Sequence, residues 1–139
     1  MNILIDTNVI LDQLLKREPF HENAESIRVL SEKGYINSYI SASAVTDIYY
    51  IAKKELNDKD EAVDLLESLL NTTSIAAVTE TSIHEALALK WDDFEDAVQY
   101  VAGQSISADY IITRNANDYT DSQIEVLSPE EFLNVITSS

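Results

Sequence analysis

The chain has 139 residues, 45% of them hydrophobic, with only two glycines and two prolines. These values suit one globular domain spanning residues 1–139, and no linker, internal repeat or low-complexity segment suggests another. The absence of cysteine excludes disulfides, thiolate zinc sites and cysteine nucleophiles, and two scattered histidines argue against a histidine-rich metal site. Any bound metal ion is therefore expected to have oxygen ligands.

The formal net charge is −16, from 25 acidic side chains against nine Lys and Arg. This balance argues against a basic groove for a nucleic-acid backbone, although divalent ions bound by clustered acids reverse the local sign of a site. No apolar run approaches the roughly 18 residues of a membrane helix. The first residues read as a strand rather than as a signal peptide, so we expect a cytoplasmic protein with no membrane association.

Hydrophobic periodicity and capping signals predict short strands that alternate with helices. In chain order, the predicted elements are a strand at 3–5, helices at 9–15 and 21–33, a strand at 35–41, helices at 41–56 and 57–71, a strand at 74–78, helices at 79–89 and 91–103, strands at 109–113 and 124–127, and a helix at 129–136. This alternation predicts an α/β domain with a mostly parallel, roughly five-stranded sheet and helices on both faces.

The first strand, Ile3–Ile5, lacks polar alternation, as is typical of a strand buried on both faces, and it ends at Asp6. The carboxyl ends of such strands are where α/β sheets bind ligands. Asp6 has two explanations at this point. It either caps the following helix, since Asp is a preferred N-cap, or serves a site that offsets the cost of burying its charge.

Acidic residues recur on two later helices. Asp47 lies in the first turns of the helix at 41–56, where the helix dipole alone explains an acid. Asp93 and Asp96 share one face of the helix at 91–103, and like charges one turn apart repel unless a cation lies between them. Asp92 and Asp93 are also explained as N-cap and first-turn acids, whereas Asp96 lies one turn deeper.

The strand at 109–113 repeats the pattern of the first, because it is apolar and ends on polar residues that include Asn115. Right-handed crossovers place all parallel strand ends at one edge of the sheet, so these residues are expected to converge with the acids. Oxygen ligands without His or Cys suit Mg²⁺ or Mn²⁺. Such a site suits phosphoryl-transfer hydrolysis, and no glycine-rich phosphate loop or dinucleotide fingerprint competes with it.

The sequence resembles the PIN domains (PilT N-terminal domains), a family that includes the VapC-like toxins. The resemblance rests on DTNVILD at 6–12, SAVTDIYYIAKK at 43–54, DDFEDAVQYVA at 92–102, ADYIITRNANDY at 108–119 and VLSPEEFL at 126–133. It implies a three-layer α/β/α sandwich and a Mg²⁺- or Mn²⁺-dependent endoribonuclease, the toxin of a toxin–antitoxin pair. The implied partners are an RNA substrate, an antitoxin protein and a second copy of the chain in a homodimer.

By motif position, Asp6, Asp47 and Asp96 resemble the family's metal-binding acids, and Asp93 resembles an auxiliary acid. The family's fourth acidic position falls on Asn115, which can coordinate a cation through its carbonyl oxygen but supplies no charge. These five residues form the predicted catalytic set.

Three further expectations concern the surroundings of the acids. Thr7 and Asn8 are expected to orient Asp6 by hydrogen bonds, and Asp118 has either a turn role or a share in the site. Arg114, Lys53 and Lys54 are candidate contacts for RNA phosphates. The alternative hypothesis is a catalytically weak or inactive PIN-like protein-interaction module. A phosphoacceptor signalling domain is disfavoured, because no acidic pair follows the first strand.

Overall fold

The computed structural model describes residues 1–138. Its elements in chain order are β1 (Asn2–Ile5), α1 (Thr7–Leu14), α2 (His21–Glu32), β2 (Asn37–Ser41), α3 (Ala42–Leu56), α4 (Lys59–Leu69), β3 (Thr73–Ala76), α5 (Glu80–Leu89), α6 (Phe94–Ser105), β4 (Tyr110–Ile112), the 3₁₀ helix η1 (Ala116–Tyr119), β5 (Glu125–Leu127) and α7 (Pro129–Thr137). Within these residues, no helix combines the length and the apolar character needed to span a membrane.

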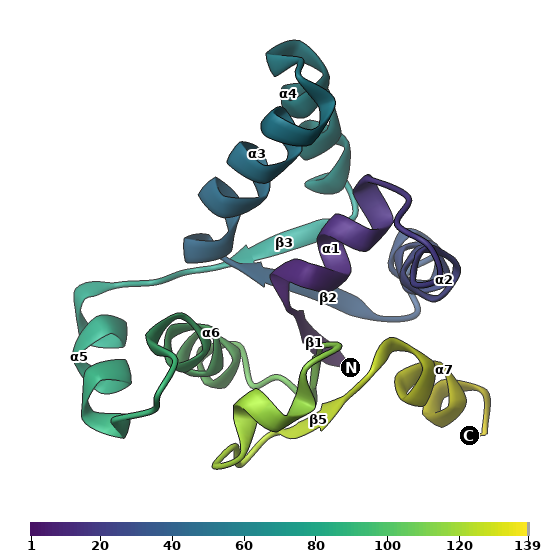
Figure 1. Ribbon diagram of the computed structural model, residues 1–139. Helices are drawn as coiled ribbons and strands as arrows, with labels where there is room; N and C mark the ends of the chain where they lie inside the picture. Colours follow the sequence, from purple (N-terminus) through teal and green to yellow (C-terminus); the bar gives the residue numbers. More distant parts are fainter. Residues whose placement is uncertain (139) are drawn as a thin grey trace.

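The five strands form one sheet in the order β3-β2-β1-β4-β5. Strand β1 is at its centre, and Figure 1 shows it between β2 and β5. Every neighbouring pair is parallel, and the register sets Ile5 of β1 opposite Ile112 of β4. The predicted five-stranded, mostly parallel sheet is confirmed. Because all strands run in one direction, their carboxyl ends lie along one edge of the sheet.

The two faces of the sheet carry separate hydrophobic cores. Ile3 and Ile5 contribute to the larger core, whereas Leu4, between them, contributes to the smaller one. The larger core takes its buried residues from α1, α2, α3, α4 and α7, and the smaller one from α6 and η1. Helix α5 packs against α6 (Figure 1). Helices therefore cover both faces, which confirms the three-layer α/β/α architecture.

The central position of β1 explains its uninterrupted apolar sequence. Ile3 and Leu4 are fully buried, because the side chains of a strand alternate between two faces that are both covered. Burial of side chains of this size stabilises the fold by roughly 1.5–3 kcal/mol each relative to exposure. The strand is thereby fixed, and so is the position of Asp6 at its carboxyl end.

Several element boundaries differ from the predicted ones for local reasons. Strand β2 begins at Asn37 rather than at residue 35, and Gly34 just before it adopts a left-handed conformation with φ of 81°. Helix α6 begins at Phe94 rather than at residue 91, because Asp93 has an extended backbone and caps the helix. The sequence pattern does not predict η1, since four residues, ANDY, are too few to show helical periodicity.

Candidate active site

A cleft of about 430 Å³ lies where the carboxyl ends of the central strands meet two helices. Its lining comes from the end of β1, from α1, α3 and α6, and from the loop and η1 that follow β4. The five residues of the predicted catalytic set all line it: Asp6, Asp47, Asp93, Asp96 and Asn115. The structure thus brings together residues that are up to 109 positions apart in the sequence (115 − 6).

Asp6 is almost fully buried, with 6% of its surface exposed, and three donors hold its carboxylate. Its Oδ1 accepts hydrogen bonds from the backbone N–H of Thr7 (2.7 Å) and from Nε2 of Gln99 (3.0 Å). Its Oδ2 accepts one from the hydroxyl of Thr113 (2.7 Å). The N-cap explanation of Asp6 is confirmed, because its side chain caps α1, and the same carboxylate also lines the cleft.

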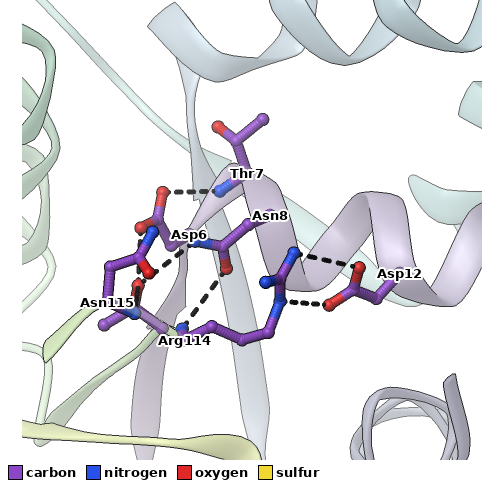
Figure 2. A network of polar contacts seen from close by, with 7 residues as sticks. Asp6, Thr7, Asn8, Asp12, Arg114 and Asn115 are labelled. Atoms are coloured by element: carbon purple, nitrogen blue, oxygen red, sulfur yellow. Dashed lines mark hydrogen bonds and ion pairs between the residues drawn. The ribbon is translucent and has the colours of Figure 1, made fainter. Parts of the chain in front are cut away.

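The residues expected to orient Asp6 contribute in different ways. Thr7 acts through its backbone N–H. Asn8 acts indirectly, because its Nδ2 donates to the hydroxyl oxygen of Thr113 (3.5 Å), which itself bonds to Asp6, while its Oδ1 accepts a hydrogen bond from the backbone N–H of Arg114 (3.4 Å). Figure 2 shows this network, in which α1 and the segment after β4 are joined side by side. The hydroxyl of Thr113 also accepts the backbone N–H of Asn115 (3.0 Å), so the same side chain positions Asp6 and Asn115.

Arg114 forms an ion pair with Asp12. Its Nε and Nη2 donate to the two carboxylate oxygens of Asp12, at 2.7 and 3.3 Å, and Asp12 is only 1% exposed (Figure 2). The guanidinium also lies 4.1 Å from the ring centroid of Phe20, a cation–π geometry. Arg114 is therefore held away from the acidic cleft. Among the described residues that line the cleft, the one basic side chain is Arg17, which forms an ion pair with Glu55.

The cleft has a strong excess of negative charge. Asp96 is buried, and burial, followed by the nearby charges of Asp6, Asp93 and Asp118, raises its pKa to about 7. The pKa of Glu95 is raised as well, chiefly because it shares a hydrogen bond with Asp47. Carboxylates in this arrangement resist being ionised together unless a cation compensates them.

Asp93 and Tyr119 contact Asp96 directly. Oδ1 of Asp93 accepts a hydrogen bond from the backbone N–H of Asp96 (3.1 Å), which confirms the N-cap role considered for Asp93. The same side chain also lines the cleft. The buried hydroxyl of Tyr119 donates to Oδ1 of Asp96 at 3.4 Å, and burial raises the pKa of this tyrosine. These contacts fix the first turn of α6 relative to η1.

Sequence reasoning missed several residues of the cleft. Glu95 was hidden among neighbouring acids, and Gln99 carries no charge, although its spacing of three residues from Asp96 places it on the same helical face. No sequence signal identifies Arg17, which follows α1. Asp118, for which a turn role competed with a site role, lines the cleft from η1.

The oxygen-rich donor set agrees with Mg²⁺ or Mn²⁺ in its chemistry. The Oε1 atom of Gln99 is buried beside Asp6 and has no hydrogen-bond partner among residues 1–138, which leaves an acceptor free at this place. Within residues 1–138, however, no three His, Cys, Asp or Glu side chains already form a group that could hold a metal ion. Metal ligation by Asp6, Asp47 and Asp96 therefore stays a prediction, and it requires their carboxylates to draw closer around a cation.

Comparisons with known proteins agree on one family. The sequence profile described as PIN domain matches residues 2–117, which is most of the chain. No curated protein sequence matches.

Solved structures with the same fold include bacterial toxin–antitoxin proteins. A toxin–antitoxin complex from Klebsiella pneumoniae has a TM-score of 0.68 at 21% identity, covering 91% of this chain and 97% of that chain. DNA-bound VapBC from Salmonella typhimurium has a TM-score of 0.68 at 16% identity, covering 93% and 98%. VapC20 from Mycobacterium tuberculosis, a toxin that cleaves the sarcin–ricin loop, has a TM-score of 0.63 at 14% identity, covering 78% and 86%. At these identities the similarity shows a shared fold.

The raised pKa of Asp96 predicts how the stability of the metal-free protein depends on pH. Folding raises this pKa from 3.8 to about 7, so the folded state binds the proton more tightly. The associated stabilisation is therefore present at low pH and is lost as the pH rises from about 4 to about 7. We expect the Tm to fall by about 5–10 °C between pH 5 and pH 8, measured by circular dichroism in EDTA. The Asp96→Asn variant should show a smaller fall, and an equal fall in both proteins would contradict this assignment.

The ion pair between Asp12 and Arg114 predicts a large loss of stability in the Asp12→Asn variant. Removing one partner of a buried pair leaves the other uncompensated, so the free energy of unfolding should drop by about 2–3 kcal/mol in urea denaturation. The exposed Asp64 on α4 provides the control, because Asp64→Asn should change this free energy by less than about 0.5 kcal/mol. Equal midpoints for the two variants would show that the pair does not stabilise the fold.

Proposed function

We propose that this chain, which belongs to the PIN domain family, is a Mg²⁺- or Mn²⁺-dependent endoribonuclease that hydrolyses RNA phosphodiester bonds. One observation carries the proposal. Six carboxylates from four segments of the chain converge in one cleft at the carboxyl edge of the parallel sheet. Those six are Asp6, Asp47, Asp93, Glu95, Asp96 and Asp118.

Asp6, Asp47 and Asp96 would hold the divalent ion. Once bound, the ion would supply an activated water and stabilise the charge that develops on the phosphate oxygens. The chain's own residues prepare this site, because Thr7, Gln99 and Thr113 fix the Asp6 carboxylate before any ligand arrives. Orientation of this kind counts for as much as the identity of the ligand, since a displaced carboxylate loses the geometry on which ion binding depends.

Asp93 and Asn115 would adjust the charge and shape of the site. Asn115 offers an amide oxygen without charge, held in place by its backbone hydrogen bond to Thr113. Asp118 lines the same cleft three residues later, so it supplies a negative charge close to the place where Asn115 supplies none.

The charge of the cleft restricts how RNA enters it. Six carboxylates face a single arginine, and Glu55 already pairs with that Arg17. A polyanion is repelled by such a surface unless divalent ions reverse its local sign. Weak RNA binding without a divalent ion follows from this, and Arg17 is the phosphate contact that the geometry favours over Arg114.

We further infer that the protein is the toxin of a toxin–antitoxin pair and binds an antitoxin. The structures from Klebsiella pneumoniae and Salmonella typhimurium, with which the chain shares its fold, are toxin–antitoxin and VapBC complexes. Apolar side chains exposed on α4 support a protein partner. Val63 on this helix is 38% exposed, and Leu70, its C-cap, is 39% exposed, although the neighbouring Ala62 and Leu69 are buried. A second copy of the chain in a homodimer would use the same kind of apolar surface.

A non-catalytic interaction module is the second candidate function. Two observations favour it, namely the neutral Asn115 and the lack, within the described residues, of a preformed metal-ion group. Such a module would bind Mn²⁺ no better than scattered surface acids do. Calorimetric titration with Mn²⁺ therefore separates the two candidates.

The Asp6→Asn variant tests the proposed activity. This substitution keeps the size of the side chain but removes its charge, so cleavage of a fluorogenic RNA with Mn²⁺ should slow by about 100-fold. Asp92→Asn is the matched control, because Asp92 is exposed and does not line the cleft, and it should cleave at the wild-type rate. Wild-type protein that cleaves no RNA with Mn²⁺, or an Asp6→Asn variant that cleaves RNA as fast as the wild type, would contradict the proposal.

A further inference from the structure

Gln99 occupies an unusual place for an uncharged polar side chain. It lies on α6, one turn beyond Asp96, and is 5% exposed, so its amide is removed from bulk water. It nevertheless lines the acidic cleft and reaches the Asp6 carboxylate, 93 residues away in the sequence. A long polar side chain is seldom buried in this way without a use for both ends of its amide.

The orientation of this amide is fixed by its neighbour. Nε2 donates to Oδ1 of Asp6 at 3.0 Å. An ionised carboxylate only accepts hydrogen bonds, so the opposite orientation would place two acceptors together. The amide oxygen Oε1 is consequently turned away from the Asp6 carboxylate. No described group donates to it, although it is buried.

A buried acceptor without a donor is costly in free energy, and native structures rarely contain one without a reason. The cleft supplies a reason. Mg²⁺ gives up its waters reluctantly and keeps several of them when bound to a few carboxylates. Those waters are hydrogen-bond donors, and the carboxylate that Gln99 holds is the first candidate ligand of the ion.

We propose that Gln99 is a positioning residue with two functions, in which Nε2 orients the Asp6 carboxylate and Oε1 accepts a hydrogen bond from a water in the hydration shell of the bound divalent ion. This inference rests on the proposed function, because it presupposes a divalent ion at Asp6. It assigns an uncharged residue of α6 to ion affinity, alongside the acids that bear the charge.

Divalent-ion affinity distinguishes this role from a purely structural one. If Gln99 only filled space, Gln99→Met, which has a similar length, would leave the affinity for Mn²⁺ unchanged. With the proposed role, Mn²⁺ affinity in calorimetric titration should fall about 10-fold or more. The Mn²⁺ concentration needed for half-maximal RNA cleavage should rise by the same factor, while cleavage at saturating Mn²⁺ changes less.

One further variant makes the comparison specific. Gln104 lies on the same helix but is exposed and bonds to the hydroxyl of Tyr100, so Gln104→Met should keep wild-type Mn²⁺ affinity. A Gln104→Met variant that loses as much Mn²⁺ affinity as Gln99→Met would overturn the specific role of Gln99.

A measurement on the wild-type protein covers the case in which a variant does not fold. In NMR spectra of ¹⁵N-labelled protein, addition of Mg²⁺ should shift the side-chain amide signals of Gln99 and leave those of Gln104 unchanged. Both sets of signals would be assigned by through-bond experiments. Wild-type protein that binds Mn²⁺ together with an undiminished Gln99→Met variant would overturn the role of Gln99 alone. Wild-type protein that binds neither ion would overturn the proposed function and this inference together.

Discussion

The burial of one carboxylate at the end of the central strand is the constraint on which the site depends. Asp6 lies where β1 leaves the core, and its charge is tolerated there because α1, α6 and the end of β4 each provide a hydrogen-bond donor. Those three segments have different partners elsewhere in the fold. The carboxylate thus requires the sheet and both helix layers to be assembled, and a local rearrangement of any one of them would leave it underbonded.

The remaining acids of the cleft, in contrast to Asp6, destabilise the folded state when they are ionised together. Burial, followed by the charges of nearby carboxylates, raises the pKa of Asp96, and a hydrogen bond shared with Asp47 is the main cause of the raised pKa of Glu95. The fold is compact enough to hold these groups near one another, since the first turn of α6 is capped and bonded to η1. The proposed divalent ion would offset this cost, because the same charges would destabilise the fold less if they were spread over the surface.

The sequence predicts the architecture well because it is encoded locally. The uninterrupted run Ile3–Ile5, the alternation of strands with helices, and the capping box at Ser128 each depend on near neighbours, and the structure confirms the sheet and its two helix layers. The convergence of the five predicted site residues follows from strand order, which parallel topology limits strongly.

The parts of the site that could not be predicted depend on long-range contacts. Gln99 and Thr113 matter because of one carboxylate that is distant in the sequence, and neither carries a charge that would single it out. Arg114 has the residue type of a phosphate contact, yet it faces Asp12 and Phe20 because α1 and the turn after it pass next to the end of β4. Tertiary packing decides which partner such a side chain contacts, and local sequence patterns contain no information about that packing.

The side-chain contacts that Thr113 and Arg114 make with the start and the middle of α1 have a consequence for variation of the chain length. Thr113 bonds to the residue that opens α1, and Arg114, its neighbour, bonds to Asp12 one and a half turns along the same helix. Thr113 and Arg114, which are consecutive, thereby fix the position of α1 relative to the end of β4. An inserted or deleted residue between Ile112 and Thr113 would displace both attachments together, whereas a change of length in the segment between η1 and β5 would leave them intact. In this fold the loop that can diversify and the loop that cannot are separated by only a few residues.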